Sequence, residues 1–148
     1  MNKLLVLIAI VLLSACGTST TQTQTSVNPF EQEWDTPFGV PPFHQIKNEH
    51  FMPAFEKGME ENLAEIVEIV NNPEAPTFAN TLEALERSGK LLAKVEGVFY
   101  NLTGSNTNPD LQELQRELSP LLSAHEDKIR LNEGLFNRVE TIWQARET

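Results

Sequence analysis

The residues best suited to chemistry in this sequence are His125 and Glu126, because together they begin the pattern H-E-x-x-H. In that pattern two histidines four residues apart lie on one helical face and hold zinc, and the glutamate activates a water molecule. Here the last position is Ile129, and one imidazole cannot replace the three protein ligands of a catalytic zinc. His125 also falls on the apolar stripe of its predicted helix. We therefore interpret it as a buried, hydrogen-bonded structural histidine.

Two other histidines, His44 and His50, lie on either side of Glu49, near a predicted helix start. Their spacing of six residues fits no standard metal site, so we assign none. The scattered glycines form no phosphate-binding loop, and no G-x-S-x-G motif is present. Composition alone leaves a Ser-His-Asp arrangement open. We predict no catalytic and no metal-binding residue in this chain.

Cys16 is the only cysteine, and it follows a predicted signal segment. Lys3 precedes an apolar run at residues 4–13, which is too short to span a hydrocarbon core that needs about 20 helical residues. Leu13-Ser14-Ala15-Cys16 matches the bacterial lipobox, in which the signal is cut before a cysteine that carries lipid. We predict a lipoprotein signal peptide at residues 1–15, a lipidated Cys16 that anchors the protein to a membrane, and a flexible tether through residue 27. The alternative is an ordinary signal peptide with a cysteine there by chance.

Composition and charge narrow the class of protein further. Hydrophobic residues make up 40% of the 148 residues and charged residues 22%, which is ordinary for a globular domain. The formal net charge is −10, so nucleic acid is not an expected partner, because phosphate binding needs a basic face. The single cysteine excludes an intrachain disulfide and a cysteine-based zinc cluster.

Residues 28–43 are rich in proline and aromatic side chains, namely Phe30, Trp34, Phe38 and Phe43. Proline fixes extended or turn conformations, and aromatic rings supply a large apolar area. We expect an extended arm that buries its rings on its own domain, since four rings are too many to leave in water. The alternative is a proline-rich recognition arm for another protein.

From residue 48 onward the apolar residues recur at helical spacing. The pattern predicts four helices and no sheet, with the helices near residues 49–71, 77–102, 110–131 and 133–146. The first helix carries one apolar stripe, made of Phe51, Phe55, Met59, Leu63, Ile66 and Val70. Pro73 and Pro76 end that helix, and Thr77 provides an N-cap for the next, so the first two helices form an antiparallel hairpin.

Two predicted helices contain a residue that normally interrupts a helix. We expect the second helix to run through Ser88-Gly89, where the small residues let a neighbouring helix approach closely. In the third helix, Ser119-Pro120 predicts a kink or a fresh helix start.

A series of short motifs in residues 28–146 resembles the N-terminal region of the M3 family of zinc peptidases, in its peptidyl-dipeptidase (dipeptidyl carboxypeptidase) branch. The motifs occur in the family's order over nearly the whole predicted mature chain. They are Asn28-Pro29-Phe30, Thr36-Pro37-Phe38-Gly39-Val40-Pro41-Pro42-Phe43, Ile46-Lys47-Asn48-Glu49-His50-Phe51, Pro53-Ala54-Phe55, Gly58-Met59, Asn72-Pro73-Glu74-Ala75-Pro76-Thr77-Phe78, Asn80-Thr81 and Glu117-Leu118-Ser119-Pro120-Leu121-Leu122-Ser123-Ala124-His125.

This resemblance implies an all-α fold in which residues 28–148 form antiparallel helical hairpins of a larger two-lobed enzyme. In the family, zinc is bound by H-E-x-x-H and a later glutamate, and dipeptides are released from the C-terminus of short peptides. None of those catalytic residues matches a position in this sequence, so the zinc and the catalytic domain would lie in the remainder of the peptidase chain. The N-terminal helices would cover the cleft and restrict entry to unfolded peptides.

Two classes of function follow from the resemblance and the lipobox. The first is the cleft-covering part of a peptidyl-dipeptidase held in the bacterial cell envelope, facing the periplasm or the exterior. The second is a free-standing, lipid-anchored helical binding module without catalysis. In either case we expect no zinc bound by this chain, and an exposed apolar patch that includes Leu91, Val98 and Trp143.

Overall fold

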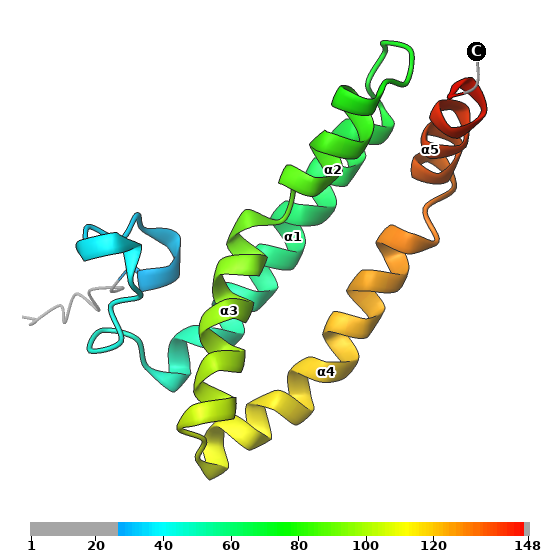
Figure 1. Cartoon of the computed structure of the whole chain (residues 1–148). Helices are drawn as coiled ribbons and strands as arrows, with labels where there is room; N and C mark the ends of the chain where they lie inside the picture. The colour runs from blue at the N-terminus through cyan, green and yellow to red at the C-terminus, as the bar shows by residue number, and fades with distance from the viewer. Residues whose placement is uncertain (1–26, 147–148) are drawn as a thin grey trace, which may run out of the picture.

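The computed structural model describes residues 27–146, and this part of the chain is helical with no strand (Figure 1). The predicted all-α class is therefore confirmed. The signal segment and Cys16 lie outside the described residues. Four longer helices dominate, namely α1 (Phe51–Val70), α3 (Lys90–Ser105), α4 (Pro109–Arg130) and α5 (Glu133–Ala145). Within residues 27–146, none of the helices combines the length and the apolar character that a membrane span requires.

Shorter helical segments connect or precede the long helices. A π-helical segment (Phe78–Glu83) continues into the short α2 (Ala84–Arg87), and three 3-10 turns lie at Pro29–Glu31, Pro37–Gly39 and Asn48–His50. The predicted N-cap at Thr77 is confirmed: its hydroxyl accepts a hydrogen bond from the Asn80 amide, and the Asn80 side chain accepts one from the Thr77 amide.

The predicted antiparallel hairpin is formed by α1 on one side and by the 78–105 segment on the other (Figure 1). The face of α1 that is buried in this hairpin differs from the predicted apolar stripe, because Met59, Leu63 and Val70 are only partly buried. The buried positions on α1 are Phe51, Ala54, Phe55, Gly58, Asn62, Ile66 and Ile69. The buried face of α1 therefore includes Gly58 and Asn62, which the apolar pattern of the sequence does not mark as buried.

Two apolar clusters form the core. The larger one is rich in aromatic rings and includes Phe30, Phe51, Phe55 and Phe99, with Phe55 and Phe99 edge to face at 5.3 Å between ring centroids. The smaller cluster consists of Ile66, Ile69 and Leu135, where α5 meets the end of α1.

The prediction of one continuous helix over residues 77–102 is wrong. The helix stops at Arg87, Ser88 has extended backbone, and Gly89 adopts a left-handed conformation with φ 67° before α3 begins at Lys90. Left-handed backbone favours glycine, which lacks the Cβ that clashes there. The backbone groups freed by the break find partners on α1, because the Gly89 amide donates to Glu65 Oε2 over 2.6 Å. Side chains of a neighbouring helix thus stabilise a break that a local pattern does not show.

At Pro120 a kink or a fresh helix start was predicted. The fresh start is wrong, since α4 is one helix from Pro109 to Arg130, and the kink stays a prediction. Pro120 is exposed, so water can bind the backbone carbonyl that loses its helical partner.

The proline-rich arm behaves only in part as expected. Phe30 is fully buried, and Trp34 packs against it with its indole nitrogen donating to the Pro29 carbonyl over 2.9 Å. Phe38 and Phe43, in contrast, are exposed, and Phe38 projects from a tight turn at φ 61°. The expectation that the whole arm buries its rings is therefore wrong for its second half.

α5 is fixed to the hairpin by a buried arginine. Arg138 donates from Nε to Thr81 Oγ1 at 3.2 Å, from Nη1 to the Asn72 carbonyl at 3.0 Å and from Nη2 to Asn80 Oδ1 at 3.0 Å. These oxygens belong to the turn and to the start of the π-helical segment, so one guanidinium joins the end of the chain to its first hairpin.

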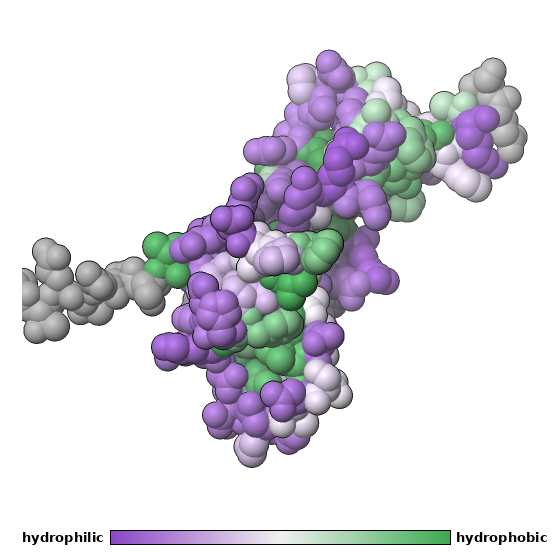
Figure 2. All heavy atoms as spheres, turned by 60° about the vertical axis from the view of Figure 1, so that its left-hand side comes forward, coloured by the Kyte–Doolittle hydropathy of each residue, from purple (hydrophilic) through white to green (hydrophobic). Residues whose placement is uncertain are grey.

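The predicted exposed apolar patch is only partly correct. Trp143 is 62% exposed, but Val98 is buried and Leu91 is half-buried against the aromatic cluster. The face seen in Figure 2 is mostly hydrophilic, with hydrophobic residues showing in several patches between the hydrophilic ones.

Candidate functional site

The histidine singled out by the sequence lies at a buried polar contact between α4 and α1. His125 is 7% exposed, and its Nε2 lies 2.9 Å from Asn62 Oδ1. Asn62 is buried to the same degree, and its Nδ2 donates to Ser88 Oγ over 3.1 Å. The Ser88 hydroxyl in turn donates to the Leu85 carbonyl at 2.7 Å. The expectation of a buried, hydrogen-bonded histidine is confirmed.

The direction of these hydrogen bonds fixes the protonation of His125. Because the Asn62 amide nitrogen donates to Ser88, its oxygen faces the imidazole and can only accept. His125 Nε2 therefore carries a hydrogen, and a neutral ring leaves Nδ1 as an acceptor. Burial, followed by the charge of Lys128, lowers the pKa of His125, while Glu126 acts in the opposite direction. Nδ1 is buried and has no hydrogen-bond partner.

The two residues that begin the H-E-x-x-H pattern do not form a metal centre. Glu126 is exposed and forms an ion pair with Arg130, one turn further along α4. Ile129 is half-buried and packs against the smaller apolar cluster. No group of three or more His, Cys, Asp or Glu side chains in residues 27–146 is arranged to hold a metal ion.

The histidines near the start of α1 are not brought together. His44 is exposed and contacts the neighbouring Gln45. The His50 Nδ1 accepts a hydrogen bond from the Lys47 amide at 3.1 Å, and its carbonyl accepts one from Asn28 Nδ2 at 2.8 Å. His50 thus holds the arm against the beginning of α1, which is a structural role.

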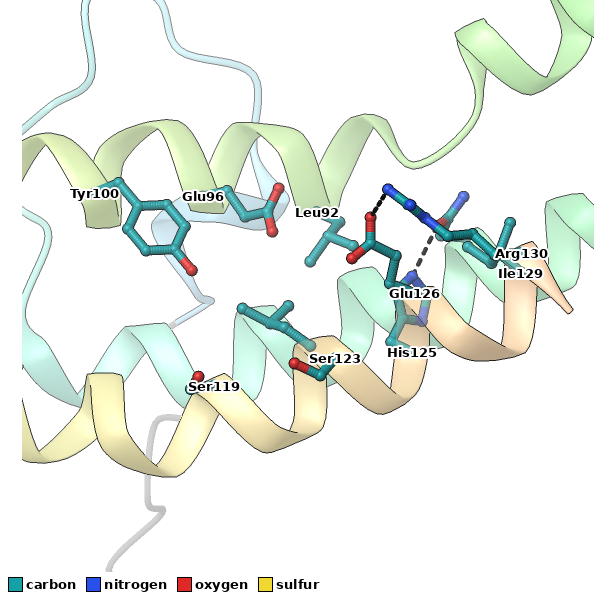
Figure 3. A pocket seen from close by; sticks show the side chains of 11 residues that line it. Leu92, Glu96, Tyr100, Ser119, Ser123, His125, Glu126, Ile129 and Arg130 are labelled. Atoms are coloured by element: carbon teal, nitrogen blue, oxygen red, sulfur yellow. Dashed lines mark hydrogen bonds and ion pairs between the residues drawn. The ribbon is translucent and has the colours of Figure 1, made fainter.

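A cavity of about 500 Å³ near these residues opens between α3 and α4. The two helices meet at the turn before Pro109 and then diverge (Figure 1). In Figure 3, Glu96 and Tyr100 project from α3 towards Ser123 and Glu126 on α4. His125 and Asn62 also line this cavity.

Burial and neighbouring negative charges raise the pKa values of two side chains in this cavity. The pKa of Glu96 is raised, first by burial and second by the negative charge of Glu126. The pKa of Tyr100 is raised by burial and then by the charge of Glu96. The cavity is therefore a place where negative charge is costly and a positive group would be favoured.

The sequence interpretation did not single out Glu96, Tyr100 or Asn62, and it named Ser88 only as a small residue within a helix. The available signal was Asn62, a polar residue four positions before Ile66 on the apolar side of a predicted amphipathic helix. Its partner His125 is 63 positions away, and its partner Ser88 lies at a break that was not expected. Glu96 appears in the sequence as one of many acidic residues, and only the divergence of α3 and α4 distinguishes it.

No protein-family model matches the chain. Sequence comparison finds two dipeptidyl carboxypeptidases, from Escherichia coli strain K12 and from Salmonella typhimurium strain LT2, that are each 44% identical, over 124 and 123 residues. Those matches include 84% and 83% of this chain but 18% of each relative. Oligopeptidase A of Salmonella typhimurium is 28% identical over 102 residues, which are 69% of this chain and 15% of that protein.

These relatives extend over most of the described helices, and both kinds are peptidases of one family. The chain belongs to the M3 family of peptidases. Its similarity is higher to dipeptidyl carboxypeptidase than to oligopeptidase A. The chain spans less than a fifth of the length of these relatives.

Proposed function

We propose that this chain is the cleft-covering helical part of a longer, zinc-dependent peptidyl-dipeptidase that releases dipeptides from the C-terminus of short peptides. The observation that carries the proposal is the 44% identity to dipeptidyl carboxypeptidase over 124 residues. A match of that extent includes the arm, the hairpin and α4 together, so it concerns a whole packed unit rather than one motif.

The described residues do not fit a catalytic zinc. His125 uses its Nε2 for Asn62, Glu126 is paired with Arg130, and Ile129 replaces the second histidine. We therefore propose that zinc and the groups that activate water belong to the remainder of the peptidase chain, and we assign no chemical step to residues 27–146. The role of this chain would be to shape the approach of short peptides to the cleft.

We further propose that Cys16 carries lipid and holds the enzyme at a bacterial membrane, facing the periplasm or the exterior. The support is the lipobox Leu13-Ser14-Ala15-Cys16 after an apolar run of ten residues. Residues 17–27 would then separate the helical region from the lipid surface by roughly 15–20 Å in the flexible-coil regime.

A chimera tests the peptidase proposal. Residues 28–146 would replace the matching segment of the Escherichia coli dipeptidyl carboxypeptidase, and release of C-terminal dipeptides from a blocked tetrapeptide would be measured. We expect the chimera to retain activity that a chelator removes. A matched chimera with Gly58→Leu, which cannot close the α1–α3 contact, should lose activity. A folded but inactive chimera would contradict the proposal.

The chain alone provides the complementary test. Purified residues 28–148 with excess zinc should release no dipeptide from the same tetrapeptide. Zinc-dependent release would show that this chain holds a complete active site. Reading the gene beyond Thr148 distinguishes the remaining alternative, because an open frame that reaches H-E-x-x-H supports the peptidase, and its absence favours a free-standing anchored module.

A further inference from the structure

The cavity between α3 and α4 contains polar groups that lack partners. Glu96 and the hydroxyls of Tyr100 and Ser123 make no hydrogen bond and no ion pair within residues 27–146. Figure 3 shows the Glu96 carboxylate and the Tyr100 hydroxyl projecting from α3 into the space that Ser123 faces from α4. Glu96 is half-buried, and Tyr100 and Ser123 are exposed, so a ligand that enters the cavity can reach all three side chains.

The charges in the cavity leave one carboxylate without a counter-ion. Glu126 is paired with Arg130, whereas Glu96 forms no ion pair within the described residues. Two carboxylates and one guanidinium give a net charge of −1 for these three side chains. Burial together with the charge of Glu126 raises the pKa of Glu96, so a cation beside it would relieve an existing cost.

The Glu96 carboxylate requires a donor, whereas the hydroxyls that line the cavity can donate or accept. His125 is 7% exposed and lines the cavity, and its buried Nδ1 is an acceptor without a partner. A carboxylate likewise only accepts. A guanidinium group has five N–H donors and no acceptor, and an ammonium group has three. Leu92, Leu122 and Ile129 supply apolar walls, which suit the methylene stem of such a side chain.

We propose that this cavity binds the side chain of an arginine or lysine carried on a polypeptide segment that packs between α3 and α4. Tyr100 lines the cavity and is 47% exposed, so its ring gives such a segment a surface to contact. The choice of a polypeptide rests on the proposed function, because a longer peptidase would place further chain against this face. The preference for a cation rests on the cavity alone.

The experiment uses the full chain in nonionic detergent and follows backbone amide shifts by nuclear magnetic resonance. The probes are acetyl-Leu-Arg-Leu-amide and the same peptide with citrulline, which has nearly the shape of arginine without its charge. We expect the arginine peptide to bind at least about tenfold more tightly, as one hydrogen-bonded charge pair provides. The shifted amides should lie around Glu96 and Ser123.

Two variants make the test specific. Glu96→Gln should abolish the preference for arginine, whereas Glu113→Gln, at an exposed position of α4 away from the cavity, should keep it. Unchanged thermal unfolding of both variants ensures that the fold is intact. Equal binding of the two peptides, or a preference that survives in Glu96→Gln, overturns the proposal.

A third probe separates the cation from the polypeptide. Free butylguanidinium should bind more weakly than the arginine peptide, because it lacks the flanking leucines. Equal affinity would overturn the polypeptide occupant and assign the cavity to free organic cations. Since no peptidase activity is measured, failure here is distinct from failure of the proposed function.

Discussion

Gly58 on α1 lies so close to Leu92 on α3 that a Cβ at Gly58 would be 2.9 Å from the Leu92 Cα. Contacts of that length do not occur with real Cβ atoms, and the obstacle is backbone that cannot rotate away. Glycine at this position therefore sets the distance between the two helices that hold the aromatic cluster.

Gly58→Ala should lower the free energy of unfolding by about 1–3 kcal/mol, because the helices must separate to admit the methyl group. Gly97→Ala on α3 is the matched control, since a Cβ there meets nothing within 4 Å. That variant should be neutral or stabilising by up to about 1 kcal/mol, because alanine is the better helix former. Urea unfolding of both variants decides the question, and equal effects would contradict it.

Asn62→Leu should destabilise the fold by about 1–3 kcal/mol, although leucine is apolar and similar in size. The change removes the partner of His125 Nε2 and of Ser88 Oγ at once, and the imidazole nitrogen stays buried. Glu56→Leu, at an exposed position of the same helix, should change stability by less than about 0.5 kcal/mol. Chemical unfolding measures both, and a small effect at Asn62 would mean that water replaces the lost contacts.

Stability should fall when the pH is lowered from about 7.5 to about 5.5, in part because of His125. Burial, with Lys128, lowers its pKa in the folded state, while the unfolded chain takes up the proton near the usual value of 6.5. The unfolded state thus binds more protons in this window, which favours unfolding. His125→Gln should show a shallower pH dependence, and His44→Gln, at an exposed position, should keep the original slope. Parallel curves for all three proteins would exclude this contribution.

Arg138→Met should cost at least about 2 kcal/mol, because the guanidinium hydrogen bonds to Thr81, Asn72 and Asn80 are lost together. Methionine keeps the apolar stem, so the effect reports the polar head. Arg87→Met is the control, since it removes only an exposed ion pair with Glu83. Hydrogen exchange should show faster opening of α5 in the first variant and not in the second.

Cys16→Ser should abolish incorporation of a palmitate analogue and release the protein from the membrane fraction or leave the signal uncleaved. The reason is that the lipobox reaction requires the thiol of that cysteine. Metabolic labelling followed by membrane fractionation provides the measurement. A wild-type protein without label and without membrane association would contradict the prediction.

The helical class, the hairpin and the Thr77 cap could be predicted because each depends on neighbouring residues. Apolar spacing defines a helical face, and a threonine after two prolines marks a helix start. The break at Ser88 and Gly89 could not be predicted, because its stability comes from Glu65 and Asn62 on another helix. Pro120 shows the reverse case, in which an exposed position tolerates a residue that normally ends a helix.

The candidate site was predictable only at His125. Its place on an apolar stripe indicated burial, and the missing second histidine argued against metal. Glu96 and Tyr100 line a cavity only because α3 and α4 diverge, and that divergence depends on how three helices pack. Phe38 and Phe43 were expected to be buried because aromatic residues usually are, yet Phe38 is fully exposed and Phe43 only lines an open cavity beside α3.

The polar contact of Asn62, Ser88 and His125 separates two apolar clusters of unequal size. One contains ten buried residues, and the other contains only Ile66, Ile69 and Leu135. Opening the smaller cluster exposes little apolar surface, so α5 and the end of the hairpin can unfold locally while the aromatic half stays intact. We therefore expect two cooperative units of different stability, of which the unit that contains α5 opens first.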